Sequence, residues 1–154
     1  MFNKVILWLL FIAPWLSLFF MKKEGIKRFM PVTLFTALLV TIIYEIAYTY
    51  EWWELKVTIV PWGHITNVSY AYGSFMIGTI WIFYLTFNKF LLYLAANIVV
   101  DGLDAFLIRE FMESRSIIHY INISKFNLFL LMLTLSLIAF GFQVFYERVF
   151  KLEN

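Results

Sequence analysis

Long apolar runs separated by short polar connections dominate the pattern of this chain. A helix needs about 20 mostly apolar residues to cross a hydrocarbon core about 30 Å thick, because each residue advances it by about 1.5 Å. We expect each long run to form one membrane-spanning helix. The predicted spans are Val5 to Met21, Met30 to about Tyr50, Ser69 to Phe87, Phe90 to Ile108, and Asn127 to about Tyr146.

This pattern predicts an all-α integral membrane protein with a single domain, residues 1–154, folded as a bundle of five transmembrane helices. Pro14 lies inside the first run and predicts a kink there, because proline removes a backbone hydrogen bond. Gly78 and Gly141 lie inside two later runs. Small residues let helix backbones approach closely, so we expect both glycines at contacts between helices.

The basic residues predict the orientation of the bundle. Four Lys or Arg residues lie between Lys22 and Arg28, in the connection between the first two runs. The positive-inside rule places such a connection in the cytoplasm. The predicted topology is therefore N-out/C-in. Over the whole chain seven basic residues fall inside and five outside, so the first connection decides the orientation.

Two longer connections, 51–68 and 109–126, then lie on the outer side. The first contains Trp52, Trp53 and Trp62, and Trp clustered near helix ends is typical of the membrane–water interface. The second has spaced apolar residues, which predict a short helix lying on the membrane surface. Both connections are thus expected to be interfacial segments.

Composition agrees with a chain solvated by lipid. Apolar residues make up 63% of the chain and charged residues 14%, whereas soluble domains have about half apolar and about a quarter charged residues. The absence of cysteine excludes disulfides, a thiol nucleophile and a cysteine metal site. The net charge of +2 is scattered between apolar runs, so we expect membrane lipids and no nucleic acid as partners.

Three carboxylates lie inside the predicted helices, where charged residues are rare and usually face the bundle interior. Glu45 lies roughly 7 Å below the outer end of the second helix, at about 1.5 Å per residue. Asp104 and Asp101 lie roughly 6 and 10 Å below the outer end of the fourth helix. All three are therefore expected at similar depth, and inverting the protein would move them together.

Residue spacing extends this acidic cluster into two polar stripes. On the fourth helix, residues three or four apart share a face, which joins Tyr93, Asn97, Asp101 and Asp104. On the second helix the matching stripe is Thr41, Glu45 and Tyr48, with Tyr44 beside it. The third helix offers Tyr70, Tyr72, Ser74 and Thr79 as lining. The candidate residues for binding a ligand or ion are Glu45, Asp101, Asp104, Asn97, Tyr48 and Tyr93.

The same carboxylates have a purely structural interpretation. They could be polar contacts that hold the helices together, accepting hydrogen bonds from tyrosines. They could also pair with cations near the outer surface, for which the sequence offers Lys56, His64, Arg109 and His119. Three acids exceed what such pairing requires, which favours a functional cavity open to the outside.

Several functions are compatible with such a cavity. The leading hypothesis is a binding or transport-type module for a cation or a small hydrophobic ligand. Asp101 and Asp104 could instead hold Mg²⁺ in a membrane enzyme acting on a lipid or prenyl substrate, although the longer acidic motifs of such enzymes are missing. A third hypothesis is a non-catalytic sensor or interaction subunit, binding another membrane protein or a second copy. No residue is assigned a catalytic role.

Two segments, Lys22 to Lys56 and Gly78 to Phe106, carry a resemblance. They contain a basic stretch leading to Pro31, Glu45 followed by a Trp pair, a Gly-Thr-Ile-Trp-Ile-Phe run and an acidic fourth helix. This pattern resembles a family of small, uncharacterised multi-pass membrane proteins of spore-forming bacteria, with no assigned activity. The resemblance implies a bacterial plasma membrane location and nothing about mechanism.

Overall fold

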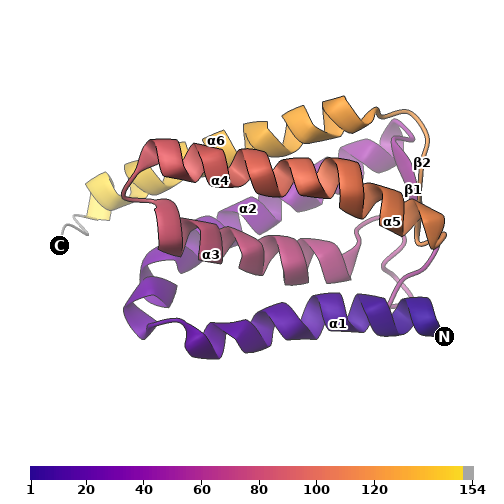
Figure 1. The fold of residues 1–154 in the computed structure, drawn as a ribbon, viewed down its shortest axis with the longest axis horizontal. Helices are drawn as coiled ribbons and strands as arrows, with labels where there is room; N and C mark the ends of the chain where they lie inside the picture. Colours follow the sequence, from indigo (N-terminus) through magenta and orange to yellow (C-terminus); the bar gives the residue numbers. More distant parts are fainter. Residues whose placement is uncertain (151–154) are drawn as a thin grey trace.

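Helices dominate the structure, a computed structural model that describes residues 1–150, with 77% of the chain helical. Five helical rods run alternately up and down, and one small sheet joins two of their connections at one end (Figure 1). The predicted all-α class is thus confirmed. The rods consist of α1 (Phe2–Ser17) with a 3-10 turn (Leu18–Phe20), α2 (Lys23–Thr49), a π-helical segment (Tyr70–Phe75) with α3 (Met76–Thr86), α4 (Phe90–Leu103) with a second π-helical segment (Asp104–Ile108) and α5 (Arg109–Ser114), and α6 (Lys125–Phe150).

Four of these rods are long and apolar enough to cross a membrane. They are Phe2–Phe20, Lys23–Thr49, Phe90–Ser114 and Lys125–Phe150. The third rod is shorter, with a π-helical segment of six residues and an α-helix of 11 residues. It lies at the centre of the bundle, where Ile77, Ile80 and Phe83 are fully buried against its neighbours.

Several predicted boundaries move. The second helix begins at Lys23 and not near Met30, because Lys, Arg and Glu are good helix formers, and it continues through Pro31. The connection 109–126 begins with a short helix as predicted, α5, but this helix continues the fourth rod to Ser114. The first helix runs through Pro14 to Ser17.

The small sheet pairs the two outer connections. Strands β1 (Trp53–Leu55) and β2 (Ile118–Tyr120) are antiparallel, with Trp53 opposite Tyr120 and Leu55 opposite Ile118. We call these two strands the cap, because they lie across the end of the bundle where α2 and α5 finish (Figure 1). The cap faces the helices through Trp53, whose ring packs edge-on against Tyr44 of α2.

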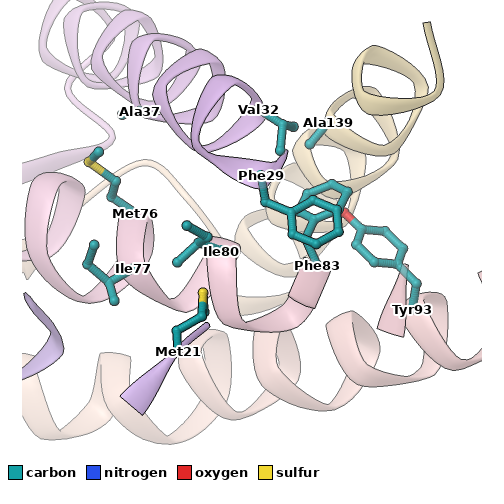
Figure 2. Packing of buried hydrophobic residues seen from close by; sticks show 10 residues of the cluster. All are labelled: Met21, Phe29, Val32, Ala37, Met76, Ile77, Ile80, Phe83, Tyr93 and Ala139. Carbon is teal, nitrogen blue, oxygen red and sulfur yellow. The ribbon is translucent and has the colours of Figure 1, made fainter. Parts of the chain in front are cut away.

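An aromatic core holds four rods together near the opposite end. The rings of Phe29 and Phe83 stack with centroids 5.8 Å apart, and Phe83 lies 4.9 Å from Tyr93 (Figure 2). Val32 of α2 and Ala139 of α6 close the cluster, so it joins α2, α3, α4 and α6. This packing fixes the face of α4 that carries Tyr93 toward the bundle interior.

Candidate functional site

A cavity of about 250 Å³ lies inside the bundle, between the third rod, α4 and α6. Its wall is mostly apolar, with Ile82, Val100 and Leu135 among the lining residues. Most of its polar side chains come from the fourth and third rods. They are Tyr93, Asn97, Asp101 and Asp104 from the fourth rod, Tyr70, Ser74 and Thr79 from the third, Thr36 from α2, and Ser136 from α6.

The polar stripe predicted on the fourth rod faces this cavity. Tyr93, Asn97 and Asp101 are buried, with at most 5% of each residue exposed, and Asp104 is half-buried. All four line the cavity. The three- and four-residue spacing of the stripe was therefore sufficient to find this side of the site, because α4 is a regular helix over that length.

Hydrogen bonds from α6 hold the inner half of the stripe. The Tyr93 hydroxyl donates to the Ser136 carbonyl at 2.7 Å, and Ser136 Oγ lies 3.2 Å from Asp101 Oδ2. Asn97 donates to the Tyr93 carbonyl at 2.9 Å. The single Ser136 hydroxyl proton is shared between Asp101 and the Met132 carbonyl, which lies 3.0 Å away. Asp101 therefore keeps most of its acceptor capacity for another partner.

Asp104 is held by the third rod. The Tyr70 hydroxyl donates to Asp104 Oδ2 at 2.6 Å. Each of these two residues is the first of a π-helical segment. Such segments insert an extra residue into a helical turn and are frequent at functional sites. The sequence pattern missed both segments, since no composition signal marks them.

Neither cavity carboxylate has a cation of its own within residues 1–150. Two of the four proposed outer cations have other partners: Lys56 pairs with Glu54 at 2.6 Å, and His119 lies 3.5 Å from Glu113. Burying an ionised carboxylate without a partner is costly. The arrangement therefore suits a cationic or hydrogen-bond-donating occupant.

Glu45 and Tyr48 do not belong to this cavity, which corrects their prediction as site residues. Both are exposed on the outer face of α2, and neither lines the cavity. Tyr44 takes the inward position instead and is buried. Adjacent residues on a helix differ in direction by about 100°, so an inward Tyr44 turns Glu45 away from the bundle.

A second, smaller cavity of about 60 Å³ lies beneath the cap. Tyr70 and Asp104 line both cavities and stand between them. Arg109, which sequence reasoning treated only as a surface cation, lines the second cavity together with Tyr44, Trp53 and Tyr120. Its burial follows from the continuation of the fourth rod beyond Ile108, a feature that the apolar pattern did not reveal.

A protein-only metal site is not formed in the part of the chain that the structure describes. Nowhere in residues 1–150 do three Asp, Glu, His or Cys side chains converge. Asp101 and Asp104 stand as a pair beside tyrosine, serine and asparagine. This donor set does not favour the Mg²⁺-dependent enzyme over the binding module.

Comparison with known proteins finds no relative: no family model, no curated protein and no solved structure matches the chain. The resemblance to uncharacterised membrane proteins of spore-forming bacteria therefore stays a prediction. The cavity and its side chains are the basis for a functional proposal.

Proposed function

We propose that this protein is a small membrane protein that binds an apolar molecule carrying a cationic group, as a binding or transport-type module. One observation carries the proposal: Asp101 and Asp104 line one internal cavity, and within residues 1–150 neither forms an ion pair. Opposite charge in the ligand would compensate the two carboxylates, which have no ion-pair partner among the described residues.

The apolar wall of the cavity determines the uncharged part of the ligand. Aliphatic and aromatic side chains such as Ile82, Phe83 and Leu135 form most of its wall, so a hydrocarbon group is favoured there. At about 250 Å³ the cavity is slightly smaller than pockets for drug-sized ligands, which start at about 300 Å³. A small primary amine with a short alkyl or aryl group has the required chemistry.

The proposal includes insertion in a bacterial plasma membrane with the N-out/C-in topology. Four rods of spanning length and the many exposed apolar side chains on their outer faces support insertion. The cap and the cavity carboxylates then lie toward the outer side. The basic segment Lys22 to Arg28 lies at the opposite end of the bundle (Figure 1).

Amine binding to the purified protein in mild detergent tests the proposal. Hexylamine and 2-phenylethylamine are titrated against the wild type, with hexanol as the uncharged probe. We expect the amines to bind and hexanol to bind at least tenfold more weakly. Asp101→Asn with Asp104→Asn should remove that difference, because an amide no longer compensates an ammonium group.

Glu45→Gln is the matched control, since it removes a carboxylate that lies outside the cavity. This variant should bind amines as the wild type does. Circular dichroism and gel filtration establish that each variant is folded. Equal binding of amine and alcohol by the folded wild type would overturn the proposal.

Native mass spectrometry of the protein released from its own membrane tests the same site without a chosen probe. A reproducible extra mass that is lost in the double aspartate variant and kept in Glu45→Gln would support a ligand at the cavity carboxylates. An extra mass that is unaffected by the aspartate changes would place the ligand elsewhere. A complex with another protein, unaffected by these changes, would favour the interaction-subunit hypothesis.

A further inference from the structure

Arg109 is a buried cation with unused hydrogen-bond donors. Only 8% of the residue is exposed, and its guanidinium carbon lies 4.2 Å from the centre of the Tyr120 ring. Nη2 donates to the Ile123 carbonyl at 2.8 Å. Nε and Nη1 are buried without a partner in the part of the chain that the structure describes.

These unpartnered donors favour the binding of a ligand that carries a hydrogen-bond acceptor. A buried donor left unsatisfied costs roughly 1–3 kcal/mol, and more when the group is charged. Guanidinium is also the side chain best suited to carboxylate and phosphate oxygens, which it binds through parallel N–H donors. The neighbouring ring does not supply an anionic acceptor, because burial and the nearby Asp104 hold the pKa of the Tyr120 phenol well above its usual range.

Arg109 and Asp104 face the same small cavity. The backbone N–H of Arg109 donates to the backbone carbonyl of Asp104, which is the i to i+5 hydrogen bond of the π-helical segment. The two side chains therefore leave the rod on the same side and line the same cavity. Across residues 1–150 their side chains form no ion pair. Opposite charges therefore line one cavity without neutralising each other.

The two cavities adjoin at Asp104. The larger one contains Asp101 and the apolar wall, and the smaller one contains Arg109. The smaller volume, about 60 Å³, is about a quarter of the larger one, so it admits a compact group beside Arg109.

We propose that the ligand is zwitterionic, with its ammonium group against Asp101 and Asp104 and an oxyanion against Arg109. This inference rests on the proposed function and adds the second charged group of the ligand. An apolar amino acid has this chemistry, with its hydrocarbon side chain in the larger cavity. An aminoethyl phosphate headgroup of a lipid has the same two charged groups.

Matched probes separate the contribution of each charge. L-leucine, 3-methylbutylamine and 4-methylpentanoate share one hydrocarbon skeleton and differ only in their charged groups. Each is titrated calorimetrically against the purified full-length protein in mild detergent. We expect leucine to bind at least tenfold more tightly than the amine, and the acid to bind most weakly. Only leucine has both an ammonium group for the two aspartates and a carboxylate for Arg109.

A parallel pair tests the lipid source. Glycerophosphoethanolamine and ethanolamine share the aminoethyl group and differ by the glycerophosphoryl group. If this pair shows the tenfold difference and leucine does not, the same zwitterion site takes a lipid headgroup. If neither zwitterion binds more tightly than its amine, the oxyanion site is overturned.

Arg109→Gln should abolish the preference for the zwitterion over its amine, because the guanidinium donors are lost. Arg115→Gln is the matched control, since Arg115 is exposed at the same end of the bundle and lines neither cavity. It should keep the preference. If Arg109→Gln does not fold, Arg109→Lys replaces it. Lysine keeps the charge with a different donor geometry and should reduce the preference for the zwitterion. The comparison of probes on the wild type tests the oxyanion site in either case.

The outcomes distinguish this inference from the function on which it rests. Amines that bind with dependence on Asp101 and Asp104, while no zwitterion binds more tightly, would overturn the role of Arg109 and leave the proposed function standing. Failure of amines and zwitterions alike to bind the folded wild type would overturn both.

Discussion

Contact between backbones at Gly73 holds the first rod on the bundle. A Cβ atom at Gly73 would lie 2.5 Å from the Leu10 carbonyl oxygen and 2.7 Å from the Phe11 Cα. The same interface is hydrogen-bonded, because Ser74 Oγ donates to the Leu10 carbonyl at 2.9 Å and the Trp15 indole donates to the Tyr72 carbonyl at 2.9 Å. Glycine at this position therefore determines how closely α1 approaches the third rod.

Gly73→Ala is expected to destabilise the protein by about 1–3 kcal/mol, the usual cost of overpacking. The obstructing atoms belong to the backbone of α1 and cannot move aside as a flexible side chain would. Gly141→Ala is the control, because its Cβ would meet nothing within 4 Å, and alanine favours a helix by up to about 1 kcal/mol. Thermal unfolding in detergent should show a lower Tm for the first variant only. Equal Tm values would contradict the contact.

The glycines and carboxylates show which residue roles a sequence can reveal. Gly78 and Gly141 were predicted at helix contacts and this is wrong, since a Cβ on either would reach open space. Asp101 could be placed because α4 has one polar face. Glu45 could not, because polar residues occur on both sides of α2 and the pattern did not determine whether Tyr44 or Glu45 faces inward.

At the scale of elements, the cap is the feature that joins distant parts of the chain. Besides the strand pairing, Lys56 N–H donates to the Ile117 carbonyl and Ile121 N–H to the Trp52 carbonyl, both at 2.9 Å. Trp53 packs against three hydrophobic clusters and touches the rings of Tyr44 and Tyr120. The cap thus closes the smaller cavity through Trp53, Ile118 and Tyr120.

Trp53→Ala should loosen the cap and destabilise the protein by about 3 kcal/mol, the low end of the range for truncating a core aromatic residue, because Trp53 is half-buried. Trp62→Ala is the control, because Trp62 is 73% exposed. Hydrogen exchange at the Lys56 and Ile121 amides measures the effect locally. Both amides should exchange faster in Trp53→Ala and at the wild-type rate in Trp62→Ala. Unchanged exchange in both variants would show that the ring does not hold the cap.

Regular helices could be predicted from the sequence, and the irregular elements could not. Apolar runs located all five rods to within a few residues, except at Lys23 and beyond Ile108. The strands Trp53–Leu55 and Ile118–Tyr120 are three residues long, too short for an alternating pattern, and their paired residues are 63 to 67 positions apart in the sequence. The π-helical segments shift the helical register by one residue, which leaves no mark in composition.

At the scale of the whole molecule, the up-and-down order of the rods separates two ends of different charge character. At the cap end, Lys56 pairs with Glu54 and Lys125 pairs with Glu110. At the other end, Arg28 donates to both carboxylate oxygens of Glu147, at 2.6 and 3.1 Å, and Lys22, Lys23 and Lys27 form no ion pair within residues 1–150. The cluster of basic residues at this end favours its cytoplasmic location, because the positive-inside rule counts Lys and Arg near the ends of the spans.

Single cysteines test the N-out/C-in topology cleanly, because the natural chain contains none. Glu24→Cys and His64→Cys place exposed thiols at opposite ends without removing a Lys or Arg. Gly25 is a poorer choice, because its Cβ would meet the Tyr84 ring. With a membrane-impermeant maleimide, His64→Cys should be labelled in intact cells and Glu24→Cys only after the membrane is opened.

The reverse labelling pattern would invert the topology, and labelling of both thiols in intact cells would contradict a chain that spans the membrane. The result also determines which compartment supplies the ligand. Asp104 and Arg109 line the smaller cavity beneath the cap, and His64 lies near the cap strand Trp53–Leu55 at the same end. If His64→Cys is accessible from outside, a zwitterion would reach its site from the outer side of the membrane. If Glu24→Cys is accessible instead, the same site would take its ligand from the cytoplasm.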